Sequence, residues 1–111
     1  MAKSNLLHTA PPIDVEAALT RLGANLKSAR LRRNLTVAQI AEKIGTGQRA
    51  VADAERGKPT TAIATYVALL WAYGLLDQLE PLAAAATDDI GHALADRRVR
   101  ARSRRRLDND F

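Results

Sequence analysis

The sequence predicts an all-α protein, because its apolar residues recur at helical spacing and no stretch alternates apolar and polar residues over the length of a strand. Glycine, asparagine and proline residues divide the chain into short helical stretches. With 111 residues and no cysteine, the chain is expected to form one compact domain with short appendages, in a compartment where disulfides do not form.

The first helix of this domain is predicted at about residues 14–33. Pro11-Pro12 blocks helix formation just before it, so residues 1–13 are predicted to be a flexible arm. The apolar stripe of the helix comprises Leu19, Leu22, Leu26 and Ala29. Asn34 tolerates the left-handed conformation and is predicted to end the helix.

Two short helices are predicted next, at about residues 36–44 and 46–55. Thr36 and Gln39 have the spacing of a capping box, and Gly45 suits a left-handed turn at the end of the first helix. Thr46 is predicted to cap the second helix. The inward residues are predicted to be Val37, Ile40, Ala41 and Ile44 in the first helix, and Ala50, Val51 and Ala54 in the second.

Two further helices complete a five-helix domain predicted to span residues 14–86. The fourth starts near Thr60 or Thr61 and ends at Gly74, and the fifth covers about residues 76–85. The buried side of the fourth helix is predicted to carry Ile63, Val67, Leu70 and Trp71. A short helix at 87–96 is expected to follow, and residues 97–111, which have few apolar side chains, are predicted to be a flexible basic tail.

Charge is strongly segregated along the chain. The formal net charge is +5 and the isoelectric point is near 10.2. Residues 21–58 carry a net charge of +6, residues 59–96 carry −5, and residues 97–111 carry +5. This distribution favours a polyanionic partner on the middle third and a nucleic-acid face there.

The middle third resembles the Cro/phage-repressor family, also called the xenobiotic-response-element type. The residues that carry this resemblance are Leu35-Thr-x-x-x-Ile40-Ala41-x-x-x-Gly45-Thr-x-Gln48-x-x-Val51-x-x-x-Glu55-x-Gly57-Lys58. The resemblance covers about residues 22–76. It implies a five-helix helix-turn-helix domain that binds operator DNA as a dimer, with the helix at 46–55 in the major groove. It also implies a salt bridge between Arg30 and Glu55.

The outward face of this recognition helix is expected to contact bases through Gly47, Gln48, Arg49, Ala52 and Asp53. Gln48 suits an adenine edge, and Arg49 suits a guanine edge or a phosphate. Asp53 is expected either to accept from a cytosine amino group or to point at Arg49. Phosphate contacts are predicted from Thr36, Val37, Thr46, Arg56 and Lys58, which lie at helix starts or just past the recognition helix.

Apolar residues beyond the needs of one small core predict a dimer interface. They are Trp71, Leu75, Leu76, Leu79 and Leu82. Residues 69–100, with the run Leu-Leu-Trp-Ala-Tyr-Gly-Leu-Leu-Asp-Gln-Leu-Glu-Pro-Leu-Ala and a later Arg-Arg-Val-Arg, more narrowly resemble HipB-type antitoxins. This second resemblance implies a homodimer that binds a HipA-like kinase toxin and represses the operon that encodes both proteins.

Two alternatives to the antitoxin remain at the level of sequence. One is a stand-alone repressor, and the other is a small basic RNA-binding protein, although the few aromatic residues fit a helix core better than base stacking. The arginines of 97–106 are predicted to follow the DNA backbone without a fixed register. Two other interpretations of that segment remain: it docks a toxin, or it only keeps the protein soluble.

Catalytic and membrane functions have little support in the sequence. His8 and His92 are isolated, and no spacing indicates a metal site, a cofactor or a nucleophile, so the chain is predicted not to be an enzyme. The longest apolar stretch, residues 62–76, is shorter than a bilayer span, and the start of the chain has no signal-peptide core. We therefore expect a bacterial cytoplasmic protein that associates with the nucleoid and makes no membrane contact.

Overall fold

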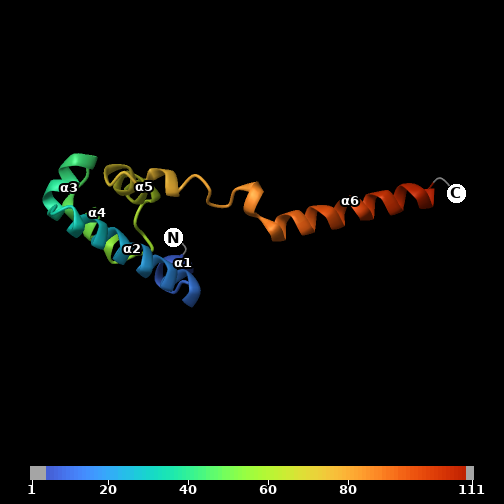
Figure 1. The fold of residues 1–111 in the computed structure, drawn as a ribbon. Helices are drawn as coiled ribbons and strands as arrows, with labels where there is room; N and C mark the ends of the chain where they lie inside the picture. Colours follow the sequence, from blue (N-terminus) through green and yellow to red (C-terminus); the bar gives the residue numbers. More distant parts are fainter. Residues whose placement is uncertain (1–4, 110–111) are drawn as a thin grey trace. The chain divides into compact units, whose positions relative to one another are not determined.

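The computed structural model describes residues 5–109, and these residues form helices, turns and loops but no strands (Figure 1). The α-helices are α1 (Leu6–Thr9), α2 (Ile13–Arg32), α3 (Val37–Ile44), α4 (Gln48–Glu55), α5 (Ile63–Ala72) and α6 (Asp89–Asn109), and two 3-10 helices are η1 (Leu76–Gln78) and η2 (Ala85–Thr87). The chain divides into two compact units, one up to Leu76 and one from Asp77. The prediction of an all-α fold is confirmed.

Local signals set the ends of α2 and α3 as predicted. Asn34 has a φ of +55° just after α2, and Gly45 has a φ of +75° just after α3. The capping box at the start of α3 is complete, because the Thr36 amide donates to Gln39 Oε1 at 2.9 Å and the Gln39 amide donates to Thr36 Oγ1 at 3.1 Å. These side chains satisfy amides that the first turn of a helix leaves open.

The core of the first unit lies where α2, α3, α4 and α5 meet. Its buried members are Leu26, Ala29, Ile40, Ala41, Val51, Ala54, Tyr66, Leu69 and Tyr73. The buried residues of α3 and α4 belong to the faces predicted to point inward. A Cβ on Gly23 would lie 2.6 Å from the Ala54 carbonyl oxygen, so α2 and the end of α4 touch backbone to backbone. This close approach fixes how α4 is held against α2.

The face of α5 that is buried differs from the predicted one. Tyr66 and Leu69 in α5 and Tyr73 after it are buried, whereas Ile63 is 71% exposed and Trp71 is 56% exposed. Val67 and Leu70 are half-buried. Because α5 is apolar on almost every side, helical periodicity alone could not select its inward face.

Three predicted boundaries also change in the structure. Residues 6–9, within the expected flexible arm, form the single turn α1, which Asn5 caps through its side chain; residues 1–4 of that arm lie outside the described residues. Gly47, not Thr46, is the N-cap of α4, so α4 begins at Gln48. The expected fifth helix at 76–85 is replaced by η1 and a series of turns, because Pro81 removes an amide donor and Ala83 takes a φ of +58°.

The C-terminal segment is more helical than predicted. The short helix expected at 87–96 and the flexible tail expected at 97–111 are instead one helix, α6, which continues to Asn109. Its start is stabilised by Asp88, whose Oδ1 accepts from the Gly91 amide at 2.9 Å. Arginine, alanine and leucine all favour helix, which accounts for its continuation. The last two residues of the expected tail lie outside the described residues.

Within residues 5–109, no helix has both the length and the hydrophobicity that crossing a bilayer would require.

Candidate nucleic-acid interface

Helix α4 is buried along one side and open along the other. Val51 and Ala54 have no exposed surface. Gln48 and Arg49, in the first turn, are exposed, as is the capping residue Gly47. The structure therefore leaves the N-terminal turn of α4 accessible to a partner while the core holds the opposite side of the helix.

The other two residues predicted to contact bases, Ala52 and Asp53, are half-buried. The Asp53 side chain is only 16% exposed, and it forms ion pairs with Arg56 and with Lys58, whose Nζ lies 3.8 Å from Asp53 Oδ2. Arg49 is not among its partners, so the expectation that Asp53 could point at Arg49 is wrong. The structure instead brings Asp53 together with two residues predicted to contact phosphate.

We call Asp53, Arg56 and Lys58 the α4 charge cluster. A backbone hydrogen bond also holds Lys58 close to Asp53, because the Lys58 amide donates to the Asp53 carbonyl at 3.0 Å. The side chains of Arg56 and Lys58 remain 65% and 43% exposed, so both can still meet an anion from solvent. The cluster has one more positive charge than negative charge.

The start of α3 offers a second group of donors. The first intrahelical bond there is from the Ile40 amide to the Thr36 carbonyl, so the amides of Val37 and Ala38 precede the regular helical bonds. Thr36 is exposed, and its oxygen already accepts from Gln39, which leaves the hydroxyl proton as a donor. The amide of Thr46 is engaged with the Ala41 carbonyl at 2.9 Å, so only its side chain can contact a phosphate.

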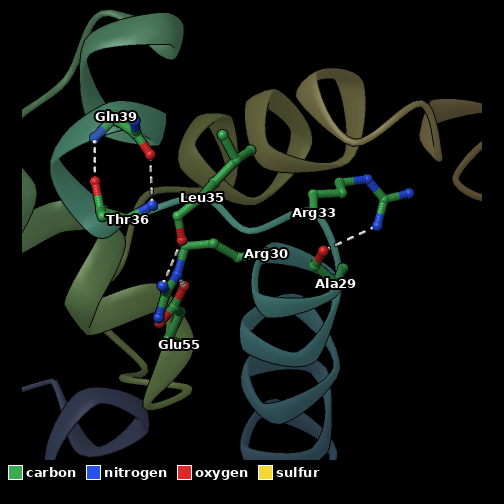
Figure 2. Close-up of polar contacts among 7 residues, drawn as sticks. All are labelled: Ala29, Arg30, Arg33, Leu35, Thr36, Gln39 and Glu55. Atoms are coloured by element: carbon green, nitrogen blue, oxygen red, sulfur yellow. Dashed lines mark hydrogen bonds and ion pairs between the residues drawn. The ribbon is translucent and has the colours of Figure 1, made fainter.

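A buried ion pair holds the end of α4 against α2 (Figure 2). Arg30 is only 8% exposed, and its Nε and Nη2 donate to the two carboxylate oxygens of Glu55 at 2.7 and 3.0 Å. Its Nη1 also donates to the Leu35 carbonyl at 2.9 Å, at the loop before α3. The hydrogen bond to Glu55 raises the pKa of Arg30. The salt bridge implied by the family resemblance is confirmed; it joins α2 to α4, and Arg30 also holds the loop before α3.

Arg33 makes a second connection that the sequence did not reveal. Its guanidinium donates to the carbonyl oxygens of Ala29 at 2.9 Å and of Tyr73 at 2.8 Å, and it lies 5.4 Å from the centre of the Tyr73 ring. These contacts tie the end of α2 to the end of α5. A basic residue in the last turn of a helix is a weak hint of such a carbonyl contact, but nothing in the sequence indicates Tyr73 as its partner.

The predicted dimer residues belong to both units. Trp71 and Leu76 are exposed in the first unit, and Leu75 is half-buried there, packed against the core. Leu79 is half-buried and Leu82 is exposed in the second unit. Trp71, near the end of α5, and Ile63, its first residue, are both exposed apolar side chains, although the sequence predicted both in the core.

Comparison with protein families matches residues 21–83 to the family described as helix-turn-helix domain. The matched segment contains α3, α4, the buried ion pair and the α4 charge cluster. Neither the comparison with curated proteins nor that with solved structures found a match.

Proposed function

Because the chain belongs to the helix-turn-helix domain family and is a DNA-binding regulator, we propose that it is a transcriptional repressor that recognises operator DNA through α4. The observation that carries this proposal is the two-sided character of α4. On its inner face Val51 and Ala54 are fully buried, whereas Gln48 and Arg49 are exposed at its first turn. A rigidly held helix that presents amide and guanidinium groups at its N-terminus suits contact with base edges in the major groove.

The surrounding donors suit contact with the DNA backbone. The open amides of α3 and the exposed cations Arg56 and Lys58 can bind phosphates, which fix the register of the protein on the duplex. In this arrangement Gln48 and Arg49 provide sequence preference, and the phosphate contacts provide affinity that does not depend on sequence.

The proposal is tested on a duplex selected by the protein from a random-sequence library. Gln48→Ala and Arg49→Ala should each weaken binding to this duplex by about 1–3 kcal/mol and reduce the preference over random duplex. Lys58→Ala should weaken binding to both duplexes equally and lower the salt slope by about one unit. Lys27→Ala, an exposed cation on α2, serves as the control. Equal losses on selected and random duplex for Gln48→Ala and Arg49→Ala would contradict base recognition by α4.

We propose that the repressor acts as a homodimer. A single eight-residue recognition helix provides few base contacts, and two-fold dimers of such proteins bind half-sites about 34 Å apart. Ile63 and Trp71, near opposite ends of α5, are exposed apolar side chains that a second copy would cover. Sedimentation analysis of Trp71→Glu should then show a monomer that binds the selected duplex more weakly. Ile13→Glu, which alters an even more exposed apolar residue on α2, should remain dimeric.

The antitoxin role stays a prediction from residues 69–100. Its test is co-expression with the product of a neighbouring kinase-like gene, followed by purification through the repressor. Recovery of a stable complex would support the antitoxin role, and its absence would leave the stand-alone repressor. Binding to a hairpin RNA more tightly than to the selected duplex would instead favour the RNA-binding alternative.

A further inference from the structure

Helix α6 lies outside the segment that matches the helix-turn-helix family, which ends at residue 83. We propose that α6 is a second DNA-binding element, which occupies the major groove of duplex DNA without selecting its sequence. It extends the proposed function, since both elements act on duplex DNA, but it does not depend on base recognition by α4.

The first argument is the density of charge along α6. Residues 97–106 contain seven arginines and no acidic residue. At about 1.5 Å of rise per residue, this gives roughly one positive charge every 2 Å along the helix axis. Duplex DNA carries one negative charge per about 1.7 Å of its own axis. The spacing of positive charge along α6 is therefore close to the spacing of negative charge along the duplex.

The second argument is that these arginines have no ion-pair partner among the side chains that the structure describes. None of the seven takes part in an ion pair among the side chains that the structure describes, residues 5–107, and all seven are exposed. Like charges four residues apart on a helix repel each other, and α6 contains three such pairs: 98 and 102, 100 and 104, 102 and 106. A dense polyanion would relieve this repulsion and stabilise the helix.

The third argument is the distribution of the arginines around α6. At 3.6 residues per turn, Arg97, Arg100 and Arg104 form one row, and with Ala101 they line a shallow hollow. A second row contains Arg98, Arg102, Arg105 and Arg106. An uncharged stripe of Val99, Ser103 and Leu107 separates the rows on one side. A helix with cations on two flanks can contact both phosphate backbones that border a groove.

The dimensions and composition favour duplex DNA over other nucleic acids. An α-helix with its side chains is about 10–12 Å wide, and the B-form major groove is about 12 Å wide. The major groove of A-form RNA is too narrow for a helix. Residues 89–109 contain no phenylalanine, tyrosine or tryptophan, the side chains on which the bases of a single strand most often stack.

The test uses three full-length variants and short random-sequence probes. The first changes all seven arginines to glutamine, which keeps helix propensity and removes the charge. The second changes all seven to lysine, which keeps the charge. The third is Ala101→Pro, which keeps every arginine but interrupts α6. Binding to duplex DNA, single-stranded DNA and duplex RNA is measured by fluorescence anisotropy between about 50 and 200 mM salt.

The proposal predicts that the glutamine variant loses affinity for random duplex DNA and that its salt slope falls by at least about three units per chain, out of a possible six or so. The lysine variant should bind duplex DNA nearly as well as the unchanged protein. Ala101→Pro should bind more weakly than the lysine variant, and circular dichroism should show that duplex DNA increases helicity in the unchanged protein but less in Ala101→Pro.

Several outcomes would overturn the proposal. Unchanged duplex binding by the glutamine variant would show that α6 does not bind DNA. An equal or larger loss on single-stranded DNA or duplex RNA would assign another ligand. If Ala101→Pro bound duplex DNA as well as the lysine variant, the arginines would bind DNA without needing a continuous helix. Failure of the separate proposal for α4 would give a different result. Gln48→Ala and Arg49→Ala would then leave binding to the selected duplex intact, while the glutamine variant of α6 would still weaken it.

Discussion

The two basic regions of this protein differ in how many of their cations have partners within the chain. In the helix-turn-helix unit, Arg30 is buried against Glu55, Arg33 is bound to backbone carbonyls, and Arg56 is paired with Asp53. In α6, among the side chains described, the seven arginines are exposed and have no acidic partner. Arg30 and Arg33 use their positive charge to position helices. The arrangement in α6 leaves positive charge available to a ligand.

This difference predicts that substitutions change the stability of the two regions to different extents. The helix-turn-helix unit depends on a small core and on buried polar contacts, so single substitutions should affect its stability. Helix α6 depends on local propensity and capping, so the same kinds of substitution should leave its stability almost unchanged. Trp71, the single tryptophan in the chain, lies in the first unit, and its fluorescence reports unfolding of that unit.

The largest effect on stability is expected from Glu55→Ala. It leaves Arg30 charged, buried and without its carboxylate, and removal of one partner from a buried ion pair typically costs about 3–5 kcal/mol. Urea unfolding followed by Trp71 fluorescence measures this loss. Asp96→Ala, which removes an exposed carboxylate in α6, should change the free energy of unfolding by less than about 0.5 kcal/mol. Similar losses of stability in Glu55→Ala and Asp96→Ala would contradict the expected difference between the two regions.

Two glycines within helices, one in each unit, allow a closer comparison of how alanine substitution changes stability. Gly23→Ala should destabilise the first unit by about 1–3 kcal/mol, because its Cβ would press on the carbonyl oxygens of Ala54 and Glu55, both at 2.6 Å. In Gly91→Ala the three atoms nearest the new Cβ all belong to the movable Asp88 side chain, so we expect the lost cap and the gained helix propensity to cancel roughly. Thermal unfolding of both variants tests this. A stable Gly23→Ala would mean that α2 and α4 can move apart without penalty.

Alkaline pH should weaken the first unit through Tyr73. Burial raises the pKa of Tyr73 to about 12, and the nearby Glu55 carboxylate adds to the shift. The unfolded chain, with a tyrosine pKa near 10, releases this proton first, so stability falls as the pH rises from about 10 to 12, by up to about 2 kcal/mol. Below pH 10 both states hold the proton, and the full contribution is present.

The measurement for Tyr73 is a series of urea unfolding curves across this pH range. Tyr73→Phe should lose less stability between pH 10 and 12 than the unchanged protein, and Tyr66→Phe, a matched buried control, should keep the original decline. An identical decline in Tyr73→Phe would exclude Tyr73 as the source.

The smallest effect is expected from Asp53→Asn. The substitution releases Arg56 and Lys58 from their carboxylate partner and removes a negative charge, so binding to random duplex DNA should strengthen by about 1 kcal/mol at low salt. Glu42→Gln, an exposed acid on α3, makes the same change in net charge outside the α4 charge cluster. If both variants strengthened binding equally, net charge alone would explain the effect.

Local chemistry in the sequence determined much of the helix-turn-helix. The capping box of Thr36 and Gln39 and the left-handed turn at Gly45 follow from contacts within one or two turns of helix, and the structure has them as predicted. Of the residues predicted to point inward, Ile40, Ala41, Val51 and Ala54 are in the core and Val37 and Ile44 pack against it, whereas Ala50 is only half-buried. The exposed side chains of Gln48 and Arg49 follow from the same periodicity. Their roles on DNA remain predictions.

Tertiary structure decided the features that depend on a choice between similar faces or partners. Helix α5 is apolar on most sides, and only packing against the core selected Tyr66 and Leu69 over Ile63 and Trp71. Asp53 had several cations within reach along the chain, and the turn after α4 selected Arg56 and Lys58. The partner of Arg33 lies forty residues away at Tyr73. Short-range patterns determine where helices begin and end, but the choice among long-range contacts is made by the packing of the whole unit.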